Sequence, residues 1–239
     1  MAALFWGILC LVVCATKLRT APRIVGLIAL LYGLNELVVM LPVWLGPWAN
    51  FGLRYNWTGK LLSTLLSLLV VFGLHLVEPR EAGLVRPVHG WRLVGVVALL
   101  LAIVQLGDGY SNRRHHELPS LETYLYQLTM PGLAEELFFR GILLAFLSRL
   151  FSRTLPFFGA QTSWGGLATV GLFALGHGFS FAGPLALFPQ AHFALGPALN
   201  AALAGLLFLW VRERSGSCWA AVATHNLSNS CLFIGHSFG

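Results

Sequence analysis

Residues 24–47 read IVGLIALLYGLNELVVMLPVWLGP, an apolar run that contains one charged side chain, Glu36. A helix needs about 20 mostly apolar residues to cross the hydrocarbon core of a bilayer, so this run predicts a membrane-spanning helix. Seven other apolar runs follow or precede it, at 2–16, 61–77, 91–107, 131–150, 163–179, 194–211 and 217–236, of which 2–16 and 61–77 are short. Strands with this pattern could not close into a barrel, and open strands leave backbone groups unsatisfied in lipid. The sequence therefore predicts an all-α, polytopic integral membrane bundle of about eight transmembrane helices.

The composition of the whole chain points the same way. Of the 239 residues, 57% are apolar and 10% are charged, whereas a soluble domain carries about 25% charged residues. The mean hydropathy of +0.75 agrees. These values exclude a disordered chain and a conventional soluble enzyme, and they predict a lipid bilayer rather than nucleic acid as the partner. Because the connections are short, we expect one structural domain.

The distribution of Lys and Arg indicates how the helices are oriented. The connections after the first, third, fifth and seventh runs hold ten of these cations, whereas the other connections hold four, among them Lys60. Cytoplasmic loops of membrane proteins carry the excess of Lys and Arg. We therefore expect both termini on the outer side of the membrane.

Four charged residues lie inside the apolar runs: Glu36, Glu135, Glu136 and Arg140. An ionisable group in the hydrocarbon core is costly, so it marks a functional or helix-pairing site. We expect Asn35 and Glu36 to pair with another helix, with a role in a cavity as the alternative. Glu136 and Arg140 are four residues apart and can pair on one helix face. Glu135 points about 100° away. We expect it to be the less neutralised carboxylate, free to act on a water, although all three charges could instead form one structural cluster.

Pro131 suits the first turn of a helix, where its missing N–H is not needed. We therefore expect the helix that carries Glu135 to begin near Pro131, with residues 121–130 as an interfacial or kinked approach. Two later runs also carry polar side chains. One contains His177, and the other presents His225 and Asn229 on one helix face because they are four residues apart.

The expected depths of these polar side chains agree. A helix rises about 1.5 Å per residue, which places Glu135, His177, His225 and Asn229 between the midplane and the same outer half of a core about 30 Å thick. A single intramembrane histidine is typically a hydrogen-bond partner between helices. Three helices that present polar groups at one depth favour a shared site instead.

The order and spacing of these residues resemble a known family. Glu135-Glu136-x-x-x-Arg140, Phe173-x-x-x-His177 and His225-x-x-x-Asn229 are similar to the motif set of the CPBP family. This family contains the CAAX-protease and bacteriocin-processing intramembrane proteases, and is also called Abi. The resemblance covers residues 131–239. It suggests a CPBP-like catalytic core at 121–239, with residues 1–120 as transmembrane helices of unassigned role.

The resemblance implies an intramembrane endopeptidase that hydrolyses a peptide bond with a glutamate-activated water. The motif positions imply a general base (Glu135), a residue that binds or polarises the water (His177), oxyanion donors (His225 and Asn229) and residues that hold the site together (Glu136, Arg140 and Phe173). Amide hydrolysis requires a base for water and donors for the developing oxyanion, so these residue types suit the reaction.

Three alternatives remain open at this stage. Glu135, His177 and His225 could bind zinc, since two histidines and a carboxylate form a known catalytic ligand set. The chain has no HExxH motif and the third motif ends in Asn229, a poor zinc ligand, so we favour no cofactor. The protein could also be a non-catalytic scaffold or immunity protein of the same fold. A proton-linked transporter should show paired broken helices in two related halves, and the sequence has no such symmetry.

The expected substrate is a membrane-anchored or secreted protein or peptide. A prenylated CAAX protein would require a site that faces the cytosol, whereas the predicted orientation opens the site outward. This difference favours a bacterial inner (plasma) membrane protein with its active site toward the extracytoplasmic half.

Overall fold

The computed structural model describes residues 8, 10–12, 14–112, 118–182 and 190–238, and this part of the chain is mostly helical. The helical elements are η1 (Ala15–Lys17), α2 (Pro22–Leu45), η2 (Pro47–Asn50), α3 (Trp57–Leu68), η3 (Leu69–Gly73), α4 (Trp91–Ser111), α5 (Leu121–Glu136), η4 (Leu137–Leu143), α6 (Leu144–Leu150), α7 (Trp164–Gly178), α8 (Leu195–Ser215) and α9 (Cys218–His236). Two antiparallel hairpins lie in connections: β1 (Leu155–Phe157) with β2 (Ala160–Thr162), and β3 (Phe179–Ala182) with β4 (Gln190–Phe193). The mostly helical fold predicted from the sequence is confirmed, and the hairpins were not predicted.

Several helices have the length and composition of membrane spans. Among the described residues, α2, α4 and α8 are long and apolar enough to cross a bilayer, and a shorter apolar helix covers Trp57–Gly73. The expected span at 2–16 falls largely on residues outside the described part. These apolar helices fit an integral membrane protein. Lys60, which the sequence placed in a connection, lies instead in the first turns of α3.

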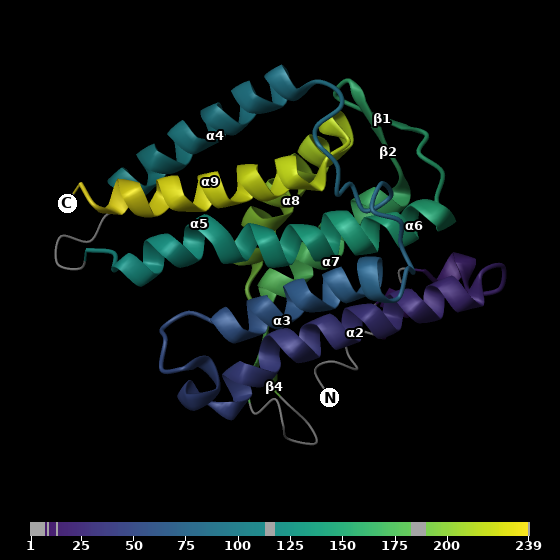
Figure 1. Cartoon of the computed structure of the whole chain (residues 1–239), viewed down its shortest axis with the longest axis horizontal. Helices are drawn as coiled ribbons and strands as arrows, with labels where there is room; N and C mark the ends of the chain where they lie inside the picture. Colours follow the sequence, from purple (N-terminus) through teal and green to yellow (C-terminus); the bar gives the residue numbers. More distant parts are fainter. Residues whose placement is uncertain (1–7, 9, 13, 113–117, 183–189, 239) are drawn as a thin grey trace.

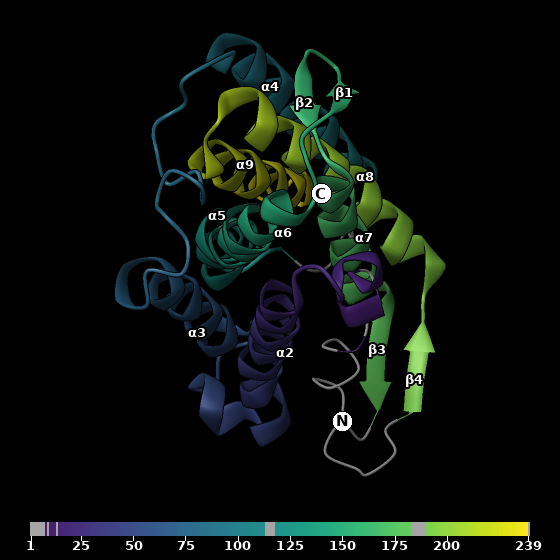
Figure 2. The same ribbon diagram turned by 90° about the vertical axis from the view of Figure 1, so that its right-hand side faces the viewer.

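Helices α2, α3, α5 and α9 run roughly along the long axis of the molecule (Figure 1), and an end-on view separates them (Figure 2). Helix α9 packs against both α4 and α5, and α7 packs against α8. Glycines allow the closest of these approaches. A Cβ atom on Gly109 of α4 would lie 2.0 Å from the carbonyl oxygen of Leu232 in α9, and one on Gly235 would lie 2.3 Å from that of Leu106. Any larger residue at either glycine would therefore separate α4 from α9.

The helix that carries Glu135 begins at Leu121, so the expected start near Pro131 is wrong. Ser120 caps this earlier start, because its side-chain oxygen accepts a hydrogen bond from the backbone N–H of Thr123 at 3.2 Å. Such a cap satisfies one of the N–H groups that the first helical turn leaves without a partner. Residues 121–150 then continue as one helical run through α5, η4 and α6.

Pro131 lies inside this run, and Asn226 of α9 compensates for it. The Asn226 side chain accepts a hydrogen bond from the Gly132 N–H at 2.8 Å and donates one to the Thr129 carbonyl oxygen at 3.1 Å. Proline within a membrane helix is tolerated where neighbouring groups satisfy the backbone atoms that it frees. Asn226 thus keeps α5 helical past Pro131 and fixes the position of α9 beside Glu135.

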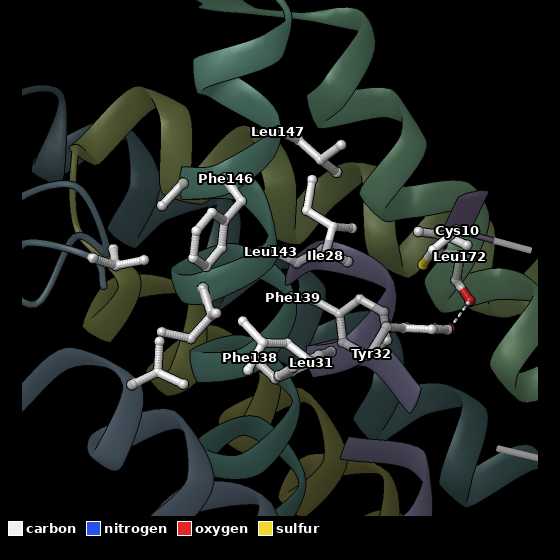
Figure 3. Close-up of a cluster of buried hydrophobic side chains, with 14 of the residues drawn as sticks. Cys10, Ile28, Leu31, Tyr32, Phe138, Phe139, Leu143, Phe146, Leu147 and Leu172 are labelled. Atoms are coloured by element: carbon white, nitrogen blue, oxygen red, sulfur yellow. Dashed lines mark hydrogen bonds between the residues drawn. The ribbon is translucent and has the colours of Figure 1, made fainter. Parts of the chain in front are cut away.

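The segment that follows the two glutamates is anchored in the apolar core. Residues of η4 adopt a π-helical turn, a feature that occurs frequently at functional sites. Figure 3 shows Phe138 and Phe139 of this turn beside Tyr32 of α2. The Tyr32 hydroxyl donates a hydrogen bond to the Leu172 carbonyl oxygen of α7 at 3.1 Å. The core therefore ties α2, η4 and α7 together next to the acidic pair.

Candidate active site

Glu136 and Arg140 form a fully buried ion pair. Neither side chain is exposed, and Nε of Arg140 lies 3.3 Å from Oε2 of Glu136. Nη1 of Arg140 donates to Oε1 of Glu136 at 3.3 Å, and Nη2 donates to the Gly205 carbonyl oxygen of α8 at 3.1 Å. The pairing predicted from the spacing is confirmed. A buried charge is tolerated because it is paired and hydrogen-bonded in this way.

His225 connects α9 to this ion pair. Its Nδ1 lies 2.9 Å from Oε1 of Glu136, and its ring stacks on Phe208 of α8 with centroids 4.5 Å apart. A carboxylate accepts hydrogen bonds only, so Nδ1 carries the proton of this contact. Its other ring nitrogen, Nε2, lies 4.0 Å from Oε2 of Glu135. His225 therefore bridges the two adjacent glutamates.

His177 approaches Glu135 from α7. Its Nδ1 lies 2.9 Å from the Phe173 carbonyl oxygen, and its Nε2 lies 3.9 Å from Oε2 of Glu135. The Phe173 ring packs between His177, at 4.4 Å between centroids, and the guanidinium carbon of Arg140, at 4.4 Å from the ring. This cation–π contact links the ring that supports His177 to the buried ion pair.

His177 and His225 thus each direct their Nε2 atom toward the same oxygen, Oε2 of Glu135. Both Nδ1 atoms face acceptors, so each ring turns its Nε2 atom toward Oε2 of Glu135. Distances of 3.9 and 4.0 Å are too long for direct hydrogen bonds, but one water can bridge groups at this separation. The arrangement can hold a water beside a carboxylate that is able to take its proton.

Glu135 also forms an ion pair that the sequence did not predict. Nζ of Lys60, from α3, pairs with Oε1 of Glu135, and both side chains are largely buried. Glu135 is therefore not the less neutralised carboxylate that we expected. The missed signal was the cap of α3, where Asn56 accepts a hydrogen bond from the Gly59 N–H at 3.0 Å. Recognising this cap would have placed Lys60 on a helix.

A cavity of about 160 Å³ opens beside these residues. Its walls come from α2, α3, α5, η4 and α7, and its lining includes Asn35, Glu36, Lys60, Glu135, Phe173 and His177. The Ser63 hydroxyl of α3 donates a hydrogen bond to Oδ1 of Asn35 at 2.6 Å, so this part of α2 does pair with another helix. Glu36 adds a second carboxylate to the wall that faces Glu135. The cavity gives a polar substrate group access to Glu135 and His177.

Residues 118–231 match a family model described as type II CAAX prenyl endopeptidase Rce1-like. This segment is similar to the Rce1-like family. The resemblance of the three motifs to the CAAX proteases is thereby confirmed, because all of the motif residues lie within the match. The Rce1-like segment begins just before the capped start of α5. No curated protein and no solved structure shows a significant match to the chain.

The remaining motif residue of the Rce1-like segment, Asn229, lies one turn after His225 on α9. Its side chain donates a hydrogen bond to Oε1 of Gln127 on α5 at 3.1 Å. Among the described residues, no hydrogen bond joins the Asn229 side chain to the side chain of Glu135, His177 or His225. The structure therefore brings together Glu135, His177 and His225, with Glu136, Arg140 and Phe173 behind them, whereas Asn229 is held by a residue that sequence reasoning missed.

The histidine and carboxylate side chains of the Rce1-like segment are also potential metal ligands. Among the described residues, no group of three or more His, Cys, Asp or Glu side chains has the arrangement of a metal site. The two histidines nevertheless carry the supporting contacts that metal-binding histidines usually have, since each Nδ1 faces a carbonyl or a carboxylate.

Proposed function

We propose that this protein is an intramembrane endopeptidase that hydrolyses a peptide bond of a membrane-associated protein or peptide. The observation that supports this most directly is the position of Glu135, whose Oε2 atom faces Nε2 of His177 and His225 at 3.9 and 4.0 Å. The Rce1-like match supports a CAAX-protease-like endopeptidase at the level of the family. Each of the three side chains has a task in such a reaction.

In the proposed reaction, Glu135 removes a proton from a water held beside His177, and the water oxygen attacks the substrate carbonyl carbon. The carbonyl electrons move onto oxygen, where His225, in its protonated form, and Asn229 donate hydrogen bonds to the oxyanion. Collapse of the tetrahedral intermediate breaks the C–N bond. Glu135 then returns its proton to the leaving amine, so the carboxylate is regenerated.

The buried groups behind these side chains position them. Glu136 orients His225, Arg140 neutralises Glu136, and Phe173 supports the ring of His177. Residues of α2 and α3, which precede the Rce1-like segment, form the opposite wall of the cavity. We therefore assign residues 121–239 to the catalytic core, and we assign part of residues 1–120 to the cavity wall.

The proposed setting is a multi-pass protein of about eight membrane helices in a bacterial plasma membrane. The excess of cations in alternate connections supports an orientation with both termini outside and the cavity in the outer half of the bilayer. The substrate in this orientation is a membrane-anchored or secreted protein or peptide rather than a prenylated cytosolic protein.

Comparison of membrane proteomes tests this function. Cells that carry Glu135→Ala should accumulate a longer precursor of at least one membrane-associated or secreted protein, and cells with the wild-type chain should contain its cleaved form. Terminal-peptide mass spectrometry locates the cleavage site. Cleavage of a synthetic farnesylated CAAX peptide by the purified protein is measured as a second test. Identical terminal peptides in both strains, together with no cleavage of the synthetic peptide, would rule out the proposed endopeptidase.

Metal removal separates the metal-free reaction from a zinc-dependent version. If Glu135 activates water without zinc, purified protein should keep its cleavage rate in the presence of a strong chelator. Elemental analysis of the same sample should then find no stoichiometric metal. Loss of activity to the chelator and its recovery with zinc would contradict this, because zinc itself lowers the pKa of bound water to about 7. Glu135 would then assist the metal rather than act alone.

A further inference from the structure

A second cavity, away from Glu135, is lined by charged side chains. It has a volume of about 370 Å³ and lies where α6 and α8 end and α9 begins. Four arginines and two glutamates provide its charges: Arg80, Arg149, Arg153, Arg212, Glu81 and Glu213. We call this the arginine cavity. It lies at the end of the helices that faces the viewer in Figure 2.

Two of the arginines are neutralised by the two glutamates. Arg149 binds Glu81 through two contacts, with Nη2 at 2.6 Å from Oε2 and Nε at 3.3 Å from Oε1. Arg153 forms an ion pair with Glu213, whose side chain is fully buried. These pairs hold the ends of α6 and α8 but leave no carboxylate for the other arginines.

Arg212 and Arg80 supply the excess positive charge. Arg212 is buried and binds backbone oxygens, with Nε at 3.2 Å from the Arg140 carbonyl and Nη2 at 2.9 Å from that of Glu81. Arg80 is exposed, and its side chain forms no hydrogen bond or ion pair with the residues that the structure describes. The termini of α6, α8 and α9 together contribute only about half a negative charge. The arginine cavity therefore keeps a clear positive excess.

We propose that the arginine cavity binds the phosphate group of an anionic phospholipid. Guanidinium groups match phosphate oxygens in geometry as well as charge. In a bilayer, phosphates are concentrated at the level of the helix ends, and basic pockets between membrane helices bind such head groups. Arg212 also links the cavity to the helical turn that carries Arg140, because its Nε donates a hydrogen bond to the Arg140 carbonyl oxygen. A bound head group would hold this end of the helices in place behind the ion pair of Glu136 and Arg140.

Lipid binding to the purified protein in a neutral detergent tests this site. Native mass spectrometry and thermal unfolding should be recorded with short-chain phosphatidylglycerol, short-chain phosphatidylcholine and inorganic phosphate. We expect phosphatidylglycerol to bind at one molecule per chain and to raise the Tm. Arg80→Gln should weaken this binding by about tenfold, because it removes a charged hydrogen-bond donor.

The matched control is Arg23→Gln, which removes the same charge from an exposed arginine at the same end of the molecule, outside the cavity. It should leave the Kd unchanged. Binding that depends on Arg80 supports the site, whether the ligand is phosphatidylglycerol or inorganic phosphate. The ratio of the Kd values for these two ligands identifies which of them the site prefers. Two results would overturn the proposal: equal binding of phosphatidylglycerol to wild type and Arg80→Gln, or phosphatidylcholine that binds as tightly as phosphatidylglycerol.

Discussion

Glu135→Gln should abolish nearly all peptide hydrolysis while the helices stay assembled. A positioned general base contributes about 10²–10⁴-fold to such a reaction, and the glutamine amide cannot take a proton from water. The amide oxygen can still accept a hydrogen bond from Lys60, so the α3–α5 contact is retained. The measurements are the cleavage rate on the identified precursor and the Tm of the purified variant.

Lys60 provides the matched comparison, because it is the other half of the same ion pair. Lys60→Met should slow cleavage by about 10²-fold at most, since it displaces Glu135 without removing it. Lys17→Met, the same change at the other lysine of the chain, should have no effect. The double variant Glu135→Gln with Lys60→Met removes both charges and should recover any lost Tm, yet remain inactive. Normal cleavage by Glu135→Gln would show that the base is another residue.

The parts of the site that the sequence predicted correctly depend on local helix geometry. A spacing of four residues puts Glu136 and Arg140 close enough to pair, even though Arg140 lies within the π-helical segment η4. The depth comparison used the rise per residue together with a start near Pro131, and this start is wrong because the helix begins at Leu121. The comparison placed His177 and His225 at the level of Glu135, and the structure brings the three together. The catalytic roles of these residues stay predictions.

The parts that the sequence missed depend on contacts between distant segments. Lys60 and Glu135 are 75 positions apart, and no local pattern predicts which side chain of α3 faces α5. The start of α5 was misplaced because Pro131 was treated as a boundary, whereas Asn226, 94 positions from Gly132, supplies the compensating hydrogen bond. Asn229 shares a helix face with His225, as predicted, but its hydrogen bond goes to Gln127. The position of a residue on a helix face gives the direction of its side chain, whereas tertiary packing determines which residue that side chain contacts.

Glu136→Gln should destabilise the protein as well as slow cleavage. This substitution leaves the fully buried Arg140 without its carboxylate and weakens the contact with Nδ1 of His225. Breaking a buried ion pair by removing one partner typically costs about 3–5 kcal/mol. For a chain of this size that corresponds to a fall in Tm of about 10 °C. Yield, Tm and cleavage rate should all decrease. The fall in Tm should exceed that of Glu135→Gln, because the Lys60 side chain is partly exposed whereas that of Arg140 is fully buried.

Adding Arg140→Gln to Glu136→Gln removes the unpaired charge and tests the cause of the instability. The Tm should recover in part, because the cost of an uncompensated buried cation disappears. Recovery should be incomplete, since Arg140 also binds the Gly205 carbonyl and packs on the Phe173 ring. Cleavage should not recover, because His225 still lacks the carboxylate that orients it. If Glu136→Gln is instead stable and inactive while Glu135→Gln unfolds, the two glutamates have the opposite roles: Glu136 performs the chemistry, and Glu135 with Lys60 holds the helices together.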